Sequence, residues 1–342
     1  MKNKKIIIAG GSGFIGQELC NYFGAENKVT VLGRQMRHQP TNAFGEDHVE
    51  KVIAQNLRFV KWDGLTLGEW ATELENADLL INLSGKSVNC RYSEKNKQEI
   101  FDSRTNTTRV LGQAVRAATH PPKLWINAAS ATIYPHATDT PRDESFTDFH
   151  RDFSVQVCQL WEKTFFEQRT PFTRKVALRM AITIGAGGVM IPYFNLLKFG
   201  LGGRQGDGKQ MYSWVHINDT CRMIEWIVDH QELEGVYNCC SPNPVTNKVF
   251  MQTLRAATGY AFGLPAYKWM LKIGARLIGT ETELILKSRW VLPTKIQAAG
   301  FQFRYAILSE AMQEIVRKTK ASQYHLFGKK LKPALSKEIE YA

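Results

Sequence analysis

The segment Gly10-Gly11-Ser12-Gly13-Phe14-Ile15-Gly16 lies between a short apolar run, residues 6–9, and a stretch with helical apolar spacing. A glycine triplet in this position is typical of a strand that turns into a helix around a dinucleotide. Gly10 permits the sharp turn, Gly13 lets the backbone approach a pyrophosphate, and Gly16 allows the helix to pack closely on the strand. The N–H groups at the start of the helix, at Phe14 and Ile15, favour an anion. The segment predicts a Rossmann-type cofactor loop, and the alternative is a glycine-rich turn without a ligand.

Short apolar runs recur after this loop, separated by polar loops or by amphipathic stretches such as residues 94–118. They lie at residues 29–32, 57–60, 79–83, 124–128, 176–184 and 236–239. Continuous apolar strands that alternate with helices indicate a parallel sheet covered on both faces. The sequence therefore predicts an α/β protein with a doubly wound parallel sheet.

The second half of the chain is interrupted by many glycines and is less regular. We expect a Rossmann domain at 1–184 plus about 210–240, and a smaller substrate domain at 185–209 plus about 241–312. Residues 313–342 are expected to form a basic tail. Its cations are Arg317, Lys318, Lys320, Lys329, Lys330, Lys332 and Lys337. A solvated end is the expected role of this tail, with nucleic-acid or membrane-surface binding as the alternative.

The composition limits the class of protein. No apolar run approaches the roughly 20 residues that span a bilayer, and the six cysteines form no CxxC pair. A reduced, cytoplasmic protein without a structural metal or a membrane partner is the simplest interpretation. The formal charge of +12 suits an anionic cofactor and an anionic small-molecule substrate, and it does not require a nucleic-acid partner. The oligomeric state is left open.

The choice of cofactor depends on the end of the second predicted strand. NAD sites usually place a carboxylate there for the ribose 2′-hydroxyl, but residues 30–43 contain no acid. Arg34 is expected to face a 2′-phosphate instead, with Arg37 as a second cation. The sequence therefore predicts NADP(H), and the alternative is that Arg34 is a solvated surface residue.

Several further segments resemble the extended short-chain dehydrogenases/reductases. They are Asp63-Gly64, Asn82-Leu83-Ser84-Gly85, Ser130-Ala131-Thr132-Ile133-Tyr134 and Val215-His216-Ile217-Asn218-Asp219. A closer resemblance is to the atypical epimerase family of nucleoside-diphosphate-sugar epimerases. It rests on Ser103-Arg104, Trp161-Glu162, Gly202-Gly203 through Trp214, Ser241-Pro242-Asn243-Pro244, and a C-terminal module from Leu264-Pro265 to Phe303. The resemblance covers about residues 4 to 312.

This resemblance implies roles for several residues near the cofactor. Asp63 would lie near the adenine, although it also reads as a turn residue. Leu83, Ser84 and Gly85 would pass close to the adenosine and the pyrophosphate. Ser130 would orient the carbonyl or hydroxyl group of the substrate.

The catalytic pair of the resembled superfamily is missing here. Those enzymes use a Tyr as general acid/base and a Lys four residues later. Glu162 fixes the register of the helix expected at 153–168, and counting back by fours places Cys158 at the Lys position and Ser154 at the Tyr position. A serine has no suitable pKa and a cysteine supplies no cation. We name Tyr134 as a possible substitute, and the other possible substitutes are Lys86, Arg91, Tyr92 and His216.

The glycine-rich stretch of the smaller domain suggests where the substrate binds. Arg204 is the best-placed cation for a phosphate or carboxylate, and Trp214 could offer a flat face to a ring. The alternative is that the glycines only make turns and Trp214 only packs.

These observations favour an NADP(H)-binding protein of the short-chain dehydrogenase/epimerase type, an oxidoreductase or epimerase acting on a sugar nucleotide or another anionic small molecule. The alternative is a non-catalytic NADP(H)-binding sensor or scaffold, which the missing Tyr–Lys pair favours. The basic tail leaves a nucleic-acid-binding protein as a third reading.

Overall fold

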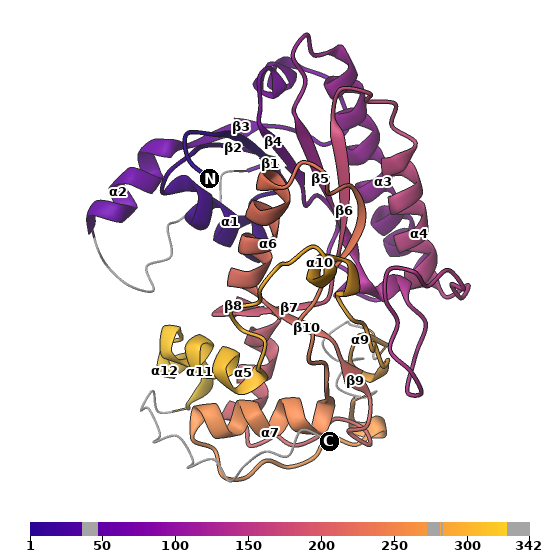
Figure 1. Cartoon of the computed structure of the whole chain (residues 1–342). Coiled ribbons are helices and arrows are strands. Elements are labelled where there is room, and N and C mark those ends of the chain that lie inside the picture. Colours follow the sequence, from indigo (N-terminus) through magenta and orange to yellow (C-terminus); the bar gives the residue numbers. More distant parts are fainter. Residues whose placement is uncertain (36–46, 272–280, 282, 327–342) are drawn as a thin grey trace.

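The computed structural model describes residues 1–35, 47–271, 281 and 283–326. A sheet of seven parallel strands forms its centre, in the order β11-β6-β5-β4-β1-β2-β3 (Figure 1). The strands are β1 (Lys5–Ala9), β2 (Lys28–Gly33), β3 (Leu57–Lys61), β4 (Leu79–Asn82), β5 (Leu124–Ser130), β6 (Arg174–Met180) and β11 (Gly235–Cys239). The strand order reverses between β1 and β4, which places a ligand crevice at the carboxyl ends of these two strands.

Helices cover both faces of the sheet, as the apolar strands predict. On one face lie α1 (Phe14–Gly24) and α6 (Ile217–Asp229), and on the other lie α3 (Glu94–Ala117) and α4 (Phe153–Phe166) (Figure 1). In β1, Ile6 and Ile8 enter the core under α1 and α6, while Ile7 enters the core under α3 and α4. The doubly wound α/β fold is confirmed. The short elements α2 (Asp47–Asn56), η1 (Glu69–Leu74) and η2 (Ala131–Ile133) complete this half.

The expected strand at 176–184 is in fact two strands. β6 ends at Met180, and β7 (Ile182–Gly185) leaves the central sheet to pair with β8 (Gly187–Gly188) and β10 (Trp214–His216). The break falls at Ala181, whose N–H still bonds Cys239, while the N–H of Ile182 already bonds Ser213. A change of hydrogen-bonding partner over one residue turns the chain out of the sheet, and an apolar run does not reveal it.

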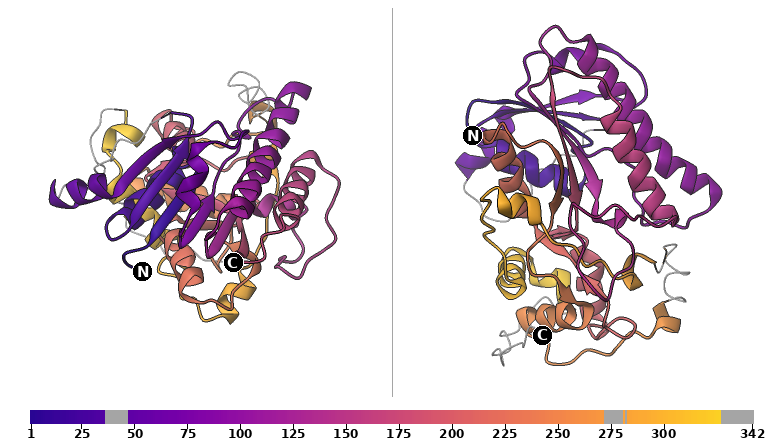
Figure 2. Two further views of the ribbon diagram at one scale, coloured as in Figure 1. Left: turned by 90° about the horizontal axis from the view of Figure 1, so that it is seen from above. Right: turned by 45° about the vertical axis from the view of Figure 1, so that its right-hand side comes forward.

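A second core lies beyond the carboxyl ends of the strands (Figure 2). It is built by α5 (Met190–Lys198), β9 (Met211–Tyr212), β12 (Val245–Thr246), α7 (Asn247–Thr258), α11 (Leu308–Lys318) and α12 (Ala321–Tyr324). The helices α9 (Glu283–Leu286) and α10 (Thr294–Ala298) belong to the same C-terminal part of the chain.

The basic tail was expected to begin at residue 313, but the folded part of the chain continues beyond this residue. α11 continues to Lys318, and Ile315, Val316 and Tyr324 are buried in the second core. The strong amphipathic pattern of 308–318 explains the difference, because its apolar face packs while Lys318 pairs with Glu314 at the surface. Lys329, Lys330, Lys332 and Lys337 lie outside the described residues.

Two buried polar residues of the segment 215–219 join the C-terminal chain to the rest of the protein. The Asp219 carboxylate accepts hydrogen bonds from the backbone N–H groups of Arg304 (2.9 Å) and Tyr305 (2.8 Å). His216 Nε2 lies 3.0 Å from the Glu314 carboxylate. Both side chains are almost fully buried, so these contacts set the register of α11 on the fold.

In the described part of the chain, no helix is long and apolar enough to cross a membrane. Those residues also contain no cluster of His, Cys, Asp and Glu that would hold a metal ion. All six cysteines are free thiols, and all but Cys90 are buried.

The Glu314 contact predicts a pH dependence of stability. Burial raises the pKa of Glu314, but the hydrogen bonds and charges of His216 and Lys318 outweigh it and lower the pKa to about 2. A carboxylate with a depressed folded-state pKa stabilises the fold above its ordinary pKa and loses that contribution as the pH falls through the folded value. We expect Glu314→Gln to remove on the order of 1–3 kcal/mol of pH-dependent stability between about pH 5 and pH 2.

The measurement is urea unfolding of both proteins at several pH values. Glu310→Gln, an exposed position on the same helix, is the matched control and should keep the pH dependence of the wild type. Parallel curves for wild type and Glu314→Gln would contradict this account of the contact.

Candidate active site

The glycine loop has the geometry that a dinucleotide needs. Gly10 has φ +77°, and a Cβ there would lie 2.9 Å from the backbone of Ser84. A Cβ on Gly16 would lie 2.5 Å from the backbone of Gly11, so the start of α1 packs directly on the loop. Above Gly13, in contrast, nothing lies within 4 Å of an added Cβ. The loop is therefore closed where the chain packs and open where a pyrophosphate would lie.

Phe14 and Ile15 occupy the first turn of α1 and are half-buried. The Phe14 ring packs on the glycines around β7 and β8, where a Cβ on Gly188 would come within 2.6 Å of the ring. Phe14 therefore links the cofactor loop to the chain that leaves the central sheet.

The ends of β2 and β3 adjoin and carry the residues expected near the adenosine. Arg34 follows β2 and is exposed, with Trp62 N bonded to Gly33 O (2.9 Å) beside it. The Asp63 carboxylate accepts hydrogen bonds from Leu65 N (2.8 Å) and from Thr66. These bonds lower the pKa of Asp63. Asp63 thus caps its own turn and is also exposed at the edge expected for adenine. Arg37 lies outside the described residues.

The loop after β4 holds Leu83, Ser84 and Gly85 against the glycine loop. The Ser84 hydroxyl is buried and has no hydrogen-bond partner among the described residues. An unpaired buried hydroxyl beside an open cradle fits a ligand that carries polar groups. The residues present therefore fit a dinucleotide.

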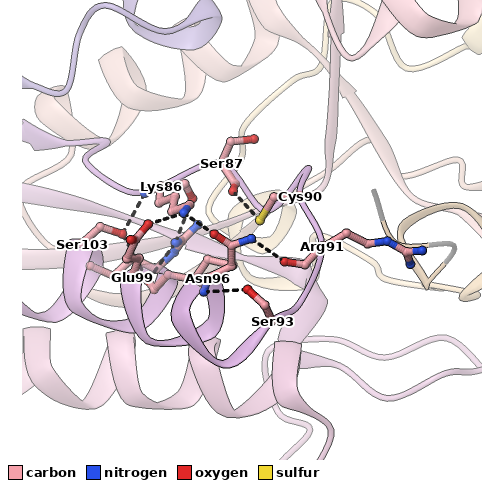
Figure 3. Close-up of polar contacts among 10 residues, drawn as sticks. Lys86, Ser87, Cys90, Arg91, Ser93, Asn96, Glu99 and Ser103 are labelled. Carbon is pink, nitrogen blue, oxygen red and sulfur yellow. Dashed lines mark hydrogen bonds and ion pairs between the residues drawn. The ribbon is translucent and has the colours of Figure 1, made fainter. Parts of the chain in front are cut away.

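A polar network fixes the chain that follows this loop (Figure 3). Lys86 Nζ pairs with Glu99 and donates to Asn96 Oδ1 (2.7 Å), while Lys86 N donates to Ser103 Oγ (2.8 Å). Asn96 in turn donates to the carbonyl of Arg91 (2.7 Å). Lys86 is thus held by α3 as a structural cation, which argues against it as a substitute acid/base.

Ser130 lies at the carboxyl end of β5, one strand from the switch point. Its hydroxyl contacts Thr132 Oγ1 (3.0 Å) and forms a hydrogen bond with the thiol of Cys158. Burial raises the pKa of Cys158 to about 12, despite the nearby charges of Arg104 and Arg289. The thiol is therefore protonated at neutral pH, and a nucleophilic role does not fit it.

Ser154, one helical turn before Cys158 on the same face of α4, has an unforeseen partner. Its hydroxyl donates to the Glu283 carboxylate (2.5 Å), which comes from α9 of the C-terminal part. Lys287 Nζ lies 2.8 Å from the same carboxylate and also pairs with Asp152. Burial raises the pKa of Glu283, but the hydrogen bonds from Lys287 and Ser154 and the charges of Lys287 and Arg289 lower it overall. A carboxylate and a cation thus stand beside the position that a Tyr–Lys pair would occupy.

The environment of Tyr134 does not fit the acid/base role that we expected of it. Its side chain is fully buried, its hydroxyl donates to Asn238 Oδ1 (2.9 Å), and it accepts from Arg179 Nη1 (2.8 Å). Burial raises the pKa of Tyr134 to about 12. Arg179 also forms a bidentate pair with Glu162, at 2.8 Å for each bond. Tyr134 therefore closes a buried polar network. Arg179, a charged residue within the apolar part of the strand 174–180, was the sequence signal for it.

The two residues expected to bind substrate point elsewhere. Trp214 is fully buried in the second core, and its indole N–H donates to the carbonyl of Asn243 (2.9 Å), so the ring offers no free face. Arg204 is exposed and lines a hollow with Lys248 and Arg255, turned toward α7. The reason lies in Gly206 and Gly208, whose left-handed conformations turn the loop so that Arg204 lies against the start of α7.

The fold and the glycine loop define a dinucleotide-binding Rossmann protein of the short-chain dehydrogenase type. Residues 6–160 match the NAD dependent epimerase/dehydratase family, and residues 268–315 match a domain of unknown function (DUF1731). The epimerase family protein YfhF of Bacillus subtilis (strain 168) is 32% identical over 323 residues, which cover 92% of this chain and 99% of that protein. The chain belongs to the epimerase family.

Solved structures agree with this assignment. The human epimerase family protein SDR39U1 (isoform 2), crystallised with NADPH, is 27% identical, with a TM-score of 0.76 over 91% of this chain and 98% of that one. A UDP-N-acetylglucosamine 4-epimerase from Methanobrevibacter ruminantium M1 shares the fold at 18% identity, with a TM-score of 0.71 over 93% and 98% of the two chains. The family binds a nicotinamide cofactor, which agrees with the open cradle at Gly13.

The cradle predicts that Gly13→Val abolishes cofactor binding without unfolding the protein. Gly13 has φ −80°, which valine adopts, and the space above it is open until the cofactor enters. We expect the variant to unfold near the wild-type temperature and to lose NADPH binding, measured by fluorescence.

Gly16→Val serves as the contrasting variant. Its side chain would overlap the backbone of Gly11, so we expect it to lower the unfolding temperature or to prevent folding. A folded Gly13→Val that binds NADPH as tightly as the wild type would show that the pyrophosphate does not cross this loop.

Proposed function

We propose that the chain catalyses NADP(H)-dependent hydride transfer, as an oxidoreductase or an epimerase, on a sugar nucleotide or another anionic small molecule. The proposal rests on one observation. An open glycine cradle and a polar cluster around Ser130 and Ser154 lie at the carboxyl edge of one parallel sheet. Ligands bind at this edge in doubly wound proteins.

The preference for NADP(H) is supported by charge. Arg34 is exposed where β2 ends, and the adjoining edge carries no carboxylate from β2. A guanidinium group forms directional, charge-assisted bonds with a phosphate monoester. The related human structure, 27% identical, was crystallised with NADPH.

The bound nicotinamide supplies the hydride acceptor or donor. The chain must then move one proton, and we assign this to Ser154 with Glu283. In oxidation, Ser154 Oγ accepts the proton of the substrate hydroxyl while its own proton passes to Glu283 Oε1, and reduction reverses both transfers. The hydroxyl already donates to that oxygen, so its lone pairs are free for the substrate. Lys287, Arg289 and Tyr92 are the other charged or titratable groups that face Glu283, and the two cations keep it ionised.

The first test of this proposal is the cofactor preference. The 2′-phosphate of NADPH would lose its charge-assisted contact with the Arg34 guanidinium, and NADH has no such phosphate. Arg34→Ala should therefore weaken NADPH binding roughly tenfold to a hundredfold and leave NADH binding unchanged. Dissociation constants from fluorescence titration decide it. Lys28→Ala, at the opposite end of β2, is the control and should change neither constant. Equal affinities of the wild type for the two cofactors would contradict the assignment.

The second test is turnover. Wild type is assayed for nicotinamide oxidation and reduction against small carbonyl compounds and sugar nucleotides. For a compound that turns over, we expect Glu283→Gln and Ser154→Ala each to lower kcat by at least about a hundredfold, because a positioned general acid/base contributes about this much. The oxidation rate of the wild type should fall at acidic pH as Glu283 becomes protonated, and Glu283→Gln should lack this limb.

The matched controls are Cys158→Ala and Glu281→Gln, whose side chains have no place in the relay. Each should stay within tenfold of the wild type. If Glu283→Gln kept the wild-type pH profile, the proton path would be wrong. If the protein bound NADPH tightly but turned over no compound, a non-catalytic sensor role would be the better assignment.

A further inference from the structure

Two buried donors near Ser154 lack partners. The Nε of Arg289 is shielded from solvent and bonds nothing among the described residues, and the hydroxyl of Tyr92 is in the same state. A buried donor without an acceptor costs free energy, and natural proteins usually supply the acceptor from the chain, from water or from a ligand.

Arg289 is held firmly by its backbone. Its N–H donates to Met211 O (2.9 Å), and its carbonyl accepts from Ser213 N (3.1 Å) and Ser213 Oγ (2.9 Å). The side chain has much weaker support. Its one hydrogen bond to the described residues is a long one, from Nη1 to Ser288 O (3.4 Å), and no described carboxylate lies within ion-pair distance of the guanidinium. Among the residues that the structure describes, nothing bonds the edge formed by Nε and Nη2.

The Arg289 guanidinium is directed toward the side of α4 that carries the proposed reaction site. It lies within electrostatic range of Cys158, Glu283 and Asp152. Two residues before Arg289, Lys287 pairs with Asp152 at the start of α4, and Glu283 accepts from Ser154 on the same helix. The segment that carries Arg289 therefore lies beside Ser154, where we place the substrate.

Tyr92 approaches the same place from the chain that follows β4. Its ring packs on Phe153, with the ring centroids 4.8 Å apart, next to Ser154. Burial raises the pKa of Tyr92 to about 12, and the Glu283 charge contributes. The phenol therefore keeps its proton at neutral pH and acts as a donor.

The charges around these donors are not balanced. Arg104, which stacks on Trp161 beside Gly85, bonds only carbonyl oxygens among the described residues and lies within electrostatic range of Cys158. Lys287 pairs with both Asp152 and Glu283, and the Glu281 carboxylate beside Tyr92 pairs with Arg91. Among the described residues, Arg104 and Arg289 are therefore left without a carboxylate at ion-pair distance. A buried site with excess positive charge stabilises an anion.

We propose that Arg289 and Tyr92 bind a carboxylate of the substrate, next to the carbon that reacts. The flat edge of Nε and Nη2 presents two parallel N–H groups, which match the two oxygens of a carboxylate better than the tetrahedral oxygens of a phosphate. The substrate class is then an oxo acid, a hydroxy acid or a sugar acid. This inference rests on the proposed function, because it places the carboxylate relative to the reacting carbon.

Binding to the NADPH-loaded protein tests this with two matched pairs of probes. UDP-glucuronic acid and UDP-glucose form one pair, and pyruvate and pyruvamide form the other, with inorganic phosphate as a separate arm. We expect the wild type to bind the carboxylate member of at least one pair about tenfold more tightly, by calorimetry. Arg289→Met should remove this discrimination, and Arg289→Lys and Tyr92→Phe should reduce it. Arg204→Met, which lies in another hollow, should keep it.

A second readout needs no ligand. Because the Arg289 guanidinium has no ion-pair partner among the described residues, Arg289→Met should unfold at the wild-type temperature or above it. Equal binding within both pairs, no binding of any probe, tighter binding of phosphate than of the carboxylates, or retained discrimination in Arg289→Met would each overturn the inference. Turnover without carboxylate discrimination refutes this inference alone. Discrimination without any turnover refutes the proposed function alone.

Discussion

The close approach of two loops at the switch point between β1 and β4 is the constraint on which the site depends. Gly10 lies so near the backbone of Ser84 that no side chain fits between them, and its positive φ turns the chain toward α1. Because β1 and β4 pair in parallel, both loops leave the sheet at the same edge. One loop then points the N–H groups of α1 outward, and the other closes the side of the crevice. A larger residue at Gly10 would separate the loops and dismantle both walls together.

Most of the fold followed from the sequence because its signals are local. Buried parallel strands are continuous apolar runs, and residues 6–9 and 79–82 show this directly. The glycine pattern is also local, since the strand, turn and helix that carry it follow one another within residues 5–24, although the contact of Gly10 with Ser84 is not local. The predictions were wrong where residues distant in the sequence determine the local structure. The strand 174–180 ends because Ile182 finds a new partner in Ser213, and Ile315, Val316 and Tyr324 are buried because α11 packs on α7 and α12 packs on α5. Neither partner is visible from the segment itself.

The same distinction separates the cofactor side of the site from the substrate side. The register of Glu162, Cys158 and Ser154 was readable from spacings of four, and it correctly placed these residues on one buried face of α4. Ser154 taken alone has no chemistry to offer. Its partner, Glu283, lies 129 residues further along the chain, and only the packing of α9 brings the carboxylate to the hydroxyl. Trp214 and Arg204 were misplaced for a related reason, since residue type suggests a ligand contact but backbone direction decides where a side chain points.

These contacts suggest how the protein can do without a tyrosine and a lysine on one helix. When a tyrosine and a lysine lie four residues apart on one helix, a single helical turn fixes both side chains, and the packing of the second core does not affect their spacing. Here the hydroxyl comes from α4, while the carboxylate and the cations Lys287 and Arg289 come from the C-terminal part. The polar cluster is complete only when the C-terminal part packs against the Rossmann half of the protein. The position in which it packs is therefore a requirement of the site. The buried contacts of Asp219 with residues 304 and 305, and of His216 with Glu314, supply that register. An apolar interface tolerates small slides, whereas a buried carboxylate that accepts two backbone N–H bonds does not. The segment 215–219 thus holds residues 304, 305 and 314 in one position, and these follow the chain that carries Glu283 and Arg289.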